Sequence, residues 1–466
     1  MKGYRVVGAG EERVVRVAFV LGTTSGGTGR HVLMLVEGLV RRGHQVLVVG
    51  PRSVEEQFGF AAAGARFVEV AVSDRPRPAG DLRAVLAIRR LTRGADVVHA
   101  HGLRAGALAA LALRPSTPAR LLLAPSGTHD AVPGGTTPAG AAVPGDTAPG
   151  GAAVPGGSAP GGAAVPGGVA APGHVAPDGG VPGESEGERG RFHGAGRSRR
   201  GRGRLVVTLH NALTTGGFVG FVYGVLERVV AGAADHVLVV SPDLGERMAA
   251  LGARDVRAAV VPAPPLRPAR RTPAEVRAEL GAGERPVLLT LARLAQQKGL
   301  ETLLDAAAGS WPTAEGGPGE PPLFVIAGEG PLRGPLEARI AAERLPVVLL
   351  GSRDDVPDLL AAATAVVMPS RWEGQPLSLS ETLMAGRPVI ASAVGGLPGM
   401  VGDGGILVPY GDVEGLRRTV REVVGDPATA ARLAGAAARR GRELPDGDEA
   451  VRSVLDVYAR PVPTDD

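Results

Sequence analysis

The sequence predicts an α/β fold in which two doubly wound domains with parallel sheets face a central cleft. Three observations support this prediction. Apolar runs of strand length alternate with longer stretches in which apolar residues recur at helical spacing. The alternation occurs twice, on either side of a proline-rich segment at residues 261–265. The chain has 466 residues, 44% of them hydrophobic, which is enough for two sizeable cores.

The first half begins with an apolar run at residues 16–21, which predicts a strand. A tight glycine loop is expected next, at residues 26–29. Apolar residues then recur at helical spacing over residues 31–42, so a helix is expected there, and Gly43 is expected to end it. Further strands are expected at residues 45–49, 96–99, 205–209 and 236–240. This alternation of strands and helices predicts a parallel sheet covered on both faces.

The second half begins with Thr272-Pro-Ala-Glu275, a capping box with proline at the first helical position. The helix that it starts is expected to end at Gly281. Strands are expected at residues 286–291, 323–327, 347–350, 365–368 and 388–391. A last helix, at about residues 449–459, is expected to pack back on the first half. The predicted domains are therefore residues 1–265, residues 266–445, and a C-terminal helix and tail at residues 446–466.

One stretch, at about residues 125–203, differs in composition from the rest of the first domain. It is dominated by Gly, Pro and Ala, and Ala-Ala-Val-Pro-Gly starts at Ala141, Ala152 and Ala163. A solenoid is excluded because these repeats hold too few apolar side chains to bury a core. We interpret the stretch as a disordered insertion with a basic end at residues 191–204. The basic end has two interpretations. It would contact anionic lipid headgroups or nucleic acid, or it is a solvated low-complexity expansion, which is the interpretation we favour.

Deleting residues 125–203 is therefore expected to leave the fold intact, because the repeats contribute no core. Thermal melting followed by circular dichroism would check this, and the deletion variant should melt cooperatively near the temperature of the full chain. An insoluble deletion variant would show that the segment has a structural role.

Composition limits the classes of function that remain. Cysteine is absent, which excludes disulfides and cysteine-based metal sites. Aromatic residues make up only 3% of the chain, which argues against a stacking platform for single-stranded nucleic acid, and no specific nucleic-acid binding is expected. The first apolar run, residues 14–21, is too short to span a bilayer and follows two acidic residues. We expect a cytoplasmic protein and leave peripheral contact with the inner membrane face open.

The most informative feature is a pair of carboxylates, Glu373 and Glu381, that follows the predicted strand at residues 365–368. Gly374 and Pro376 break the chain, and a helix is expected to open near Leu377. Glu373 then lies in the loop at the carboxyl end of a strand, where open α/β sheets bind ligands. Two such carboxylates can accept hydrogen bonds from sugar hydroxyls, and helix N-terminal amides can hold a phosphate. Taken alone, an ordinary solvated helix face explains the pair equally well.

Two cations, Arg293 and Lys298, follow the strand expected at residues 286–291. A planar guanidinium and a compact ammonium at a strand end suit a diphosphate, although a surface loop with two basic residues has the same appearance. Gly328 and Gly330 follow the next predicted strand, where glycine allows a ligand to approach the backbone.

Several metal or nucleotide signals are rejected, and no metal site is predicted. Asp446 and Asp448 form an Asp-x-Asp pair, but no strand precedes them. Residues 22–27 have the spacing of a P-loop, but Thr28 replaces its lysine. His99 and His101 would share one face of a strand, yet the sequence offers no apparent third ligand, so a structural role is expected.

The order of these motifs resembles that of the retaining glycosyltransferases of family 4, which have the GT-B fold of two Rossmann-like domains. In the second half the resemblance rests on Arg293 and Lys298, Gly328-Glu-Gly-Pro331, the two glutamates, and residues 386–391. In the first half it rests on five segments: Gly26-Gly-Thr-Gly-Arg-His31, Arg42-Gly-His-Gln-Val46, Asp96-Val-Val-His-Ala-His101, Thr208-Leu-His-Asn211, and residues 234–241. It spans essentially the whole chain apart from the insertion.

The resemblance implies a role for each matching position. Arg293 and Lys298 would neutralise the donor diphosphate, Glu373 would bind hydroxyls of the donor sugar, and Glu381 would bind the nucleotide ribose. His210 would line the reaction centre. The catalytic set is thus Arg293, Lys298, Glu373 and His210. The remaining donor-binding positions are Gly26, Gly27, Gly328, Gly330, Gly374, Gln375, Pro376, Leu377 and Glu381. Gln375 and Pro376 depart from the aromatic and glycine residues of many members, which leaves the identity of the sugar open.

The implied function is transfer of a sugar from a UDP-, GDP- or ADP-sugar to an unknown glycan, lipid or small-molecule acceptor, with retention and without a metal or another cofactor. Two alternatives are retained. The first is a sugar-nucleotide epimerase of similar fold, which would act on the donor without an acceptor. The second is a non-catalytic protein that binds a sugar nucleotide, against which the intact set of charged residues argues.

Overall fold

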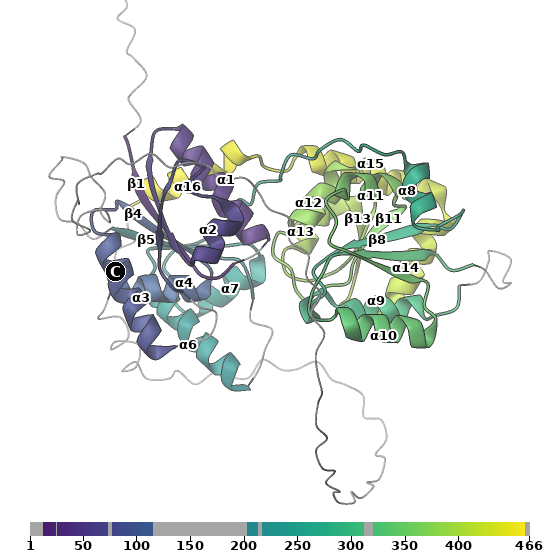
Figure 1. Ribbon diagram of the computed structural model, residues 1–466, viewed down its shortest axis with the longest axis horizontal. Coiled ribbons are helices and arrows are strands. Elements are labelled where there is room, and N and C mark those ends of the chain that lie inside the picture. Colours follow the sequence, from purple (N-terminus) through teal and green to yellow (C-terminus); the bar gives the residue numbers. More distant parts are fainter. Residues whose placement is uncertain are drawn as a thin grey trace, which may run out of the picture. The chain divides into compact units, whose positions relative to one another are not determined.

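The computed structural model describes residues 13–24, 26–72, 77–114, 203–212, 217–311 and 320–461. The predicted insertion at about residues 125–203 lies outside the described residues, apart from its last glycine. The described residues form two parallel β-sheets, each with helices on both faces (Figure 1). The prediction of an α/β fold with two doubly wound sheets is confirmed.

The first sheet is parallel and has the strand order β3-β2-β1-β4-β5-β6-β7. Its strands are β1 (Arg16–Leu21), β2 (Gln45–Gly50), β3 (Arg66–Glu69), β4 (Val97–His101), β5 (Arg204–Leu209), β6 (His236–Val239) and β7 (Val256–Ala258). The chain runs outward from β1 to β3 and then returns to β4 beside β1. The carboxyl ends of β1 and β4 therefore form a topological switch point, which is where ligands bind in such sheets.

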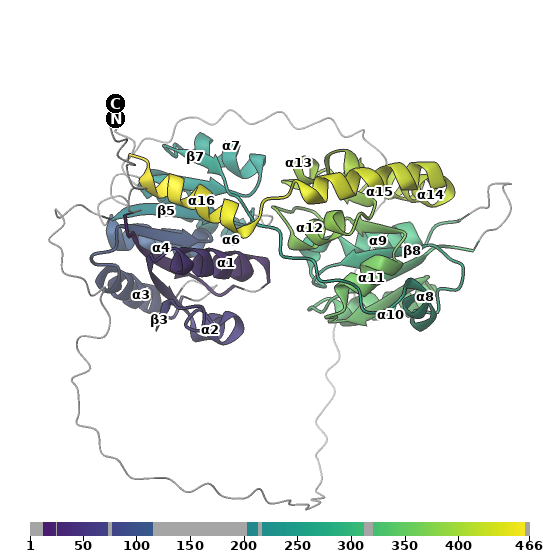
Figure 2. The same ribbon diagram turned by 90° about the horizontal axis from the view of Figure 1, so that it is seen from above.

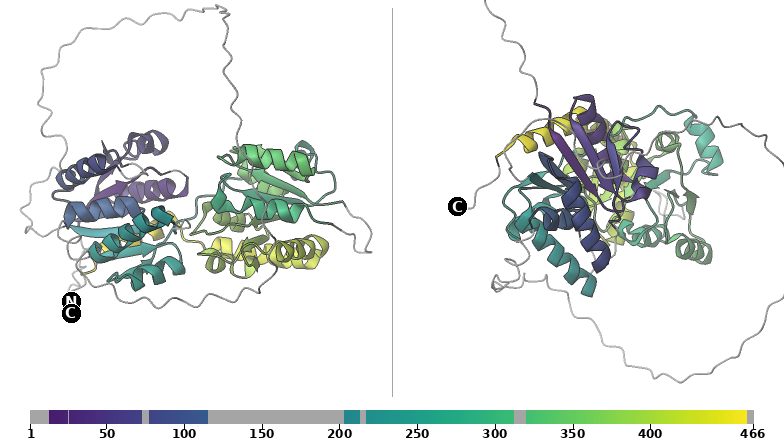
Figure 3. Two further views of the ribbon diagram at one scale, coloured as in Figure 1. Left: turned by 90° about the horizontal axis from the view of Figure 1, so that it is seen from below. Right: turned by 60° about the vertical axis from the view of Figure 1, so that its left-hand side comes forward.

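Helices cover both faces of this sheet. They are α1 (Gly27–Arg41), α2 (Arg52–Phe58), α3 (Pro78–Leu91), α4 (Leu103–Leu113), α6 (Gly217–Ala233) and α7 (Pro242–Ala250). Helices α1 and α2 contact each other on one face, and α4 contacts both α3 and α6 on the other face (Figures 1 and 3).

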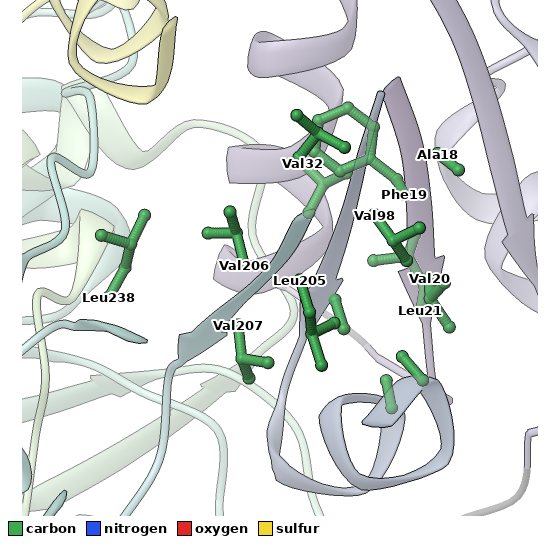
Figure 4. Packing of buried hydrophobic residues seen from close by; sticks show 14 of the residues in the cluster. Ala18, Phe19, Val20, Leu21, Val32, Val98, Leu205, Val206, Val207 and Leu238 are labelled. Carbon is green, nitrogen blue, oxygen red and sulfur yellow. The ribbon is translucent and has the colours of Figure 1, made fainter. Parts of the chain in front are cut away.

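The core of the first half is built mainly from the central strands. Side chains of β1, β4, β5 and β6 pack together with Val32 of α1 in the close view (Figure 4). Residues of β1 from Val17 onward are completely buried, and so are Leu205, Val206 and Val207 of β5. These strands read as continuous apolar runs because helices bury both faces of a parallel sheet.

The second sheet is also parallel, with the strand order β10-β9-β8-β11-β12-β13. Its strands are β8 (Val287–Leu291), β9 (Leu323–Ala327), β10 (Val347–Gly351), β11 (Ala365–Met368), β12 (Val389–Ser392) and β13 (Gly405–Val408). The switch point lies between β8 and β11. The loops that leave these two strands carry the predicted cations and carboxylates.

Two apolar clusters, one on each face, support the second sheet. Its helices are α8 (Pro273–Glu279), α9 (Leu300–Ala307), α10 (Arg333–Glu343), α11 (Val356–Ala362), α12 (Leu377–Met384), α13 (Leu397–Val401), α14 (Val413–Gly425) and α15 (Pro427–Arg442). One cluster includes residues of α8, α11 and α12, and the other includes residues of α9, α10 and α14. The predicted capping box of α8 is present: Glu275 N–H donates to Thr272 Oγ1 at 3.3 Å, and the Glu275 carboxylate accepts from Thr272 N–H at 2.8 Å.

The final helix, α16 (Gly447–Ala459), lies beside α1 (Figure 2). Gly38 of α1 has no room for a Cβ atom because Val451 packs against it. Val451, Val454 and Tyr458 are buried in the core cluster of the first half. The helix begins with Asp446 as its cap, since Glu449 N–H donates to Asp446 Oδ1 at 2.8 Å.

The structure corrects the predicted start of the first helix. Helix α1 begins at Gly27, so most of the expected glycine loop belongs to its first turn, and Gly26 is its cap with φ of 68°. Gly29 lies against the ring of Phe58, and a Cβ atom there would overlap it. The glycine therefore serves close packing of a helix rather than a loop conformation.

Three edge strands, β3, β7 and β13, were not predicted. Each has three or four residues, and most of these are half-buried or exposed. Strands β3 and β7 lack the continuous apolar runs that identify the central strands, whereas β13 contains the short run Ile406-Leu-Val408.

Candidate active site

The loop that leaves β8 packs directly on the loop that leaves the neighbouring strand β9. Leu294 N–H donates to Glu329 O at 2.9 Å. A Cβ atom on Gly328 would overlap Ala292 O, and one on Gly330 would overlap the backbone of Leu294. The two predicted glycines are therefore brought against the cationic loop, and their small size is needed for contact between the loops.

Arg293 projects from this loop at the carboxyl end of β8 and is exposed. Its guanidinium makes no hydrogen bond or ion pair with any other residue that the structure describes. It is thus a free cation at the switch point of the second sheet. A free guanidinium can form two parallel hydrogen bonds with a phosphate.

Lys298 and Glu373, which lie in different loops, form an ion pair. Lys298 Nζ lies 2.6 Å from Glu373 Oε1, and Ser370 Oγ donates to the same oxygen at 2.7 Å. Glu373 is 4% exposed. Two groups that the resemblance assigned to neighbouring parts of the donor, the diphosphate and the sugar, are therefore bound to each other. Ser370 was not identified as a site residue from the sequence.

Gly299 allows the Lys298 loop to reach the Glu373 loop. It follows the short 3₁₀ helix η1 (Gln296–Lys298), has φ of 59° and caps α9. A Cβ atom on Gly299 would overlap Pro369 O. Across the same junction, the Gln297 side chain donates to Trp372 O at 2.9 Å. Gly299 was not predicted as a site residue, although its place directly after Lys298 was a usable signal.

A turn after β12 supports the Glu373 backbone from another side. Gly396 N–H donates to Glu373 O at 2.9 Å. Gly395 has φ of 54°, and a Cβ atom on either glycine would overlap the backbone of Glu373 or Gly374. These two glycines were also missed, because their function depends on a contact with a distant loop.

The segment from Gly374 to Leu377 connects this loop to α12. The Gln375 side-chain amide donates to Ala259 O at 3.0 Å, so in this structure it anchors the loop. Pro376 is the cap of α12, and Leu377 is the first residue of the helix. The predicted opening of the helix near Leu377 is confirmed, and its N-terminal amides lie next to the Glu373 loop.

Glu381 differs from Glu373 because its carboxylate has no hydrogen-bond or ion-pair partner within the described ranges. It lies on α12 and is half-buried. Burial raises the pKa of Glu381 above its ordinary value, and the charges of Arg30 and Arg267 oppose this effect. An unpaired carboxylate of this kind can accept hydrogen bonds from two neighbouring hydroxyls.

The first half contributes the start of α1. An added Cβ atom on Gly26 would meet no other heavy atom within 4 Å, and one on Gly27 would lie 3.9 Å from Leu377 Cγ. Gly27 therefore lies close to the start of α12. Gly26 leaves an open approach to the backbone, as expected for a ligand-binding loop.

His210 follows β5 and is in contact with two other histidines. His101 Nδ1 and His210 Nε2 are 3.0 Å apart, and the rings of His31 and His210 meet edge to face at 5.4 Å. From the sequence, only His210 was assigned to the reaction centre, and His101 was set aside as a metal ligand because no third ligand was apparent. The structure places His31 and His210 beside His101, and a ring nitrogen from each lies within 4.8 Å of the others.

His99 has the expected structural role. Its Nδ1 lies 2.7 Å from Tyr458 Oη, and its Nε2 lies 2.7 Å from Thr208 Oγ1. Burial, together with the nearby His31, lowers the pKa of His99 to about 3, so the ring is neutral. Asp448 is likewise structural, since it pairs with Arg41 at 3.2 Å on the surface.

Comparison with known proteins identifies two family models in this chain. Residues 285–426 match the model described as glycosyl transferases group 1. Residues 26–153 and 190–264 match the glycosyl transferase 4-like domain. The two matches correspond to the second and the first sheet.

Curated proteins similar to this chain are named as sugar transferases. An alpha-D-kanosaminyltransferase of Streptomyces kanamyceticus is 34% identical over 167 residues, which are 34% of this chain and 42% of that protein. A 2-deoxystreptamine N-acetyl-D-glucosaminyltransferase of Streptomyces fradiae is 36% identical over 169 residues, which are 34% of this chain and 39% of that protein. The matches therefore span less than half of each relative.

Among solved structures, HepE from Anabaena in complex with UDP and glucose has a TM-score of 0.64 to this chain. The sequences are 17% identical, and the match covers 96% of this chain and 100% of that one. This likeness concerns the fold, which is GT-B. In the parts of the chain that the structure describes, no helix combines the length and the apolar character needed to cross a membrane.

Proposed function

Because the chain belongs to the group 1 glycosyl transferases, we propose that it transfers a sugar from a nucleotide-diphosphate sugar to an acceptor. We further propose that the transfer retains the anomeric configuration and requires no metal cofactor. One observation carries this proposal. A free Arg293, the Lys298–Glu373 pair and an unpaired Glu381 gather at the carboxyl ends of β8 and β11 and on the helix that follows. These are the charges that a diphosphate, a sugar and a ribose require.

The proposed reaction breaks the bond between the anomeric carbon and the donor phosphate oxygen. The acceptor hydroxyl forms its new bond on the same face of the sugar, and its proton passes to the leaving phosphate. Negative charge grows on the leaving diphosphate, where Arg293, Lys298 and the N-terminal amides of α9 and α12 would stabilise it. Because the protein supplies these cations itself, no divalent ion is needed to neutralise the diphosphate.

The ion pair between Lys298 and Glu373 suggests how a donor would be accommodated. Lys298 Nζ and Glu373 Oε1 are 2.6 Å apart, with Glu373 buried and Lys298 half-buried. A donor would bring a phosphate for Lys298 and sugar hydroxyls for Glu373, so each group would exchange one partner for another. Neither charge would be left buried and unpaired, which would otherwise cost several kcal/mol.

Transfer is favoured over the two alternatives. An epimerase would interconvert UDP-sugars in the absence of an acceptor, and family membership does not favour that reaction. The complete set of charged residues, which includes Glu373 and Glu381 as well as the two cations, argues against a non-catalytic binding protein. Calorimetric binding of a nucleotide sugar without turnover across many acceptors would favour the second alternative.

A donor screen tests the proposal. The full chain would be incubated with UDP-, GDP- and ADP-sugars, with and without EDTA, and nucleotide release would be measured. The name of one relative makes 2-deoxystreptamine the first acceptor to include. We expect release from one class of donor, unaffected by EDTA. Release that EDTA abolishes and Mg²⁺ restores would overturn the metal-independent mechanism.

A further inference from the structure

The three histidines at the switch point of the first sheet come from three separate elements. His31 lies on α1, His101 ends β4, and His210 follows β5. These elements converge because β4 lies between β1 and β5 in the sheet. The rings are mutually close, with centroids separated by 5.7 Å for His31 and His101 and by 5.3 Å for His101 and His210.

Three of the six ring nitrogens in this trio are buried without a partner among the described residues. Both nitrogens of His31 and Nε2 of His101 are buried and have no hydrogen-bond partner within the described part of the chain. His31 and His101 are 2% and 3% exposed. A buried polar group without a partner costs roughly 1–3 kcal/mol, so a core role alone does not account for His31. His210 is only partly buried and gives the trio an approach from solvent.

The environment of the three rings also favours their uncharged form. Burial lowers the pKa of His31 to about 4, and it lowers the pKa of His101 and of His210 well below the ordinary value. All three imidazoles are therefore neutral near pH 7, which is the form that binds a metal ion.

The donor set fits zinc better than the common hard cations. It consists of imidazole nitrogens without a carboxylate, whereas Mg²⁺ and Ca²⁺ prefer oxygen. With Zn–N bonds of 2.0–2.1 Å, tetrahedral ligand atoms lie about 3.3 Å apart. The closest pair here is 3.0 Å apart, and all three atoms lie within 4.8 Å of one another, so small movements would suffice. His99 is excluded as a ligand because Tyr458 and Thr208 occupy both of its nitrogens.

We propose that His31, His101 and His210 bind one Zn²⁺ ion, and that the bound ion inhibits the enzyme. Three protein ligands leave a fourth position for water or another donor atom. The inhibitory part rests on the proposed function, since the ion would occupy His210, the histidine assigned to the reaction centre. The binding part is independent of it.

Metal titration of the tag-free full chain tests the binding. Zn²⁺ would be followed by calorimetry, and Co²⁺ by the visible absorption that tetrahedral coordination makes intense. We expect one ion per chain. His31→Leu and His31→Gln should each weaken Zn²⁺ binding by about 100-fold or more, since loss of a ligand exceeds the 10- to 100-fold effect of an outer-shell partner.

Matched controls separate this site from the other histidines. The full chain with His129→Asn, His174→Asn and His193→Asn together removes the three histidines that lie outside the described residues. This variant and His236→Asn should bind Zn²⁺ as the unaltered chain does. If binding disappears in the triple variant and persists in both folded His31 variants, the proposed site is wrong.

Activity distinguishes the two parts of the proposal. For each protein, the rate of nucleotide release with Zn²⁺ is divided by its own metal-free rate. This ratio should be well below one for the unaltered chain and near one for His31→Leu. A bound ion that leaves this ratio unchanged would overturn the inhibition and leave the site established. A chain without transferase activity that still binds Zn²⁺ would overturn the proposed function alone.

Discussion

Replacing Lys298 with alanine is expected to lower kcat by about 100- to 1,000-fold, by analogy with removal of one oxyanion-stabilising donor. The affinity for the nucleotide should change much less. The reason is that charge on the leaving diphosphate grows as the bond to the sugar breaks, so the ammonium interacts most strongly in the transition state. Single-turnover rates and nucleotide binding by calorimetry would separate the two effects.

Lys298→Ala also removes the ion-pair partner of a buried carboxylate. Lys298 is the cation paired with Glu373, which is 4% exposed. Removing one member of a buried ion pair costs about 3–5 kcal/mol of stability, because the other charge stays buried without its partner. Some loss of activity could then come from a distorted loop.

A double variant, Lys298→Ala with Glu373→Gln, removes the unpaired charge at residue 373 and keeps the size of that side chain nearly constant. Glu373→Ser is unsuitable for this purpose because it changes the volume as well as the charge. We expect the double variant to regain the melting temperature while its kcat stays well below that of Glu373→Gln alone, which is the reference because Glu373 is itself assigned to the donor sugar. Arg339→Ala is the distant control, since it removes a cation of α10 that bridges Glu343 of the same helix and Asp305 of α9. A double variant with restored kcat would make Lys298 a structural residue.

The central strands could be predicted from the sequence because burial on both faces requires apolar residues at successive positions. The apolar runs that become β1 and β8 are buried on both faces, so each reads as a continuous run of Val, Leu and similar residues. The edge strand β3 was missed because it holds only two apolar residues, Phe67 and Val68, between charged ones. Strand β13 does contain a short apolar run, Ile406-Leu-Val408, which was a usable signal.

The site was predictable only as separate motifs. The residues around Arg293, Glu373 and Glu381 follow identifiable strands, so their position at one edge of the sheet could be inferred. The ion pair between Lys298 and Glu373 joins residues 75 positions apart, and local patterns carry no information about it. The same holds for His31, which is an ordinary residue of an amphipathic helix until the fold places it beside His210.

Glu381→Ala should weaken nucleotide binding by about 10- to 100-fold, since a hydrogen bond to a charged group contributes about 1.5–3 kcal/mol. Turnover at saturating donor should change less, because the ribose does not react. Calorimetry with the nucleotide alone measures the affinity directly. Glu337→Ala on α10 is the control for removal of a carboxylate, and an unchanged affinity in Glu381→Ala would remove this residue from the donor site.

Two further signatures follow from the environment of Glu381. Burial raises its pKa above the ordinary 4.5, so the folded protein takes up its proton more readily than the unfolded chain. Ionisation of this group therefore lowers stability as pH rises through that range, and at neutral pH its removal should leave the melting temperature unchanged or raise it. Nucleotide affinity should have the opposite dependence and fall on acidification, because the protonated carboxyl loses one acceptor and its charge. This loss of nucleotide affinity on acidification should begin above pH 4.5 in the unaltered chain and be absent from Glu381→Gln. If other groups bind the ribose, nucleotide affinity will depend on pH in the same way in both proteins.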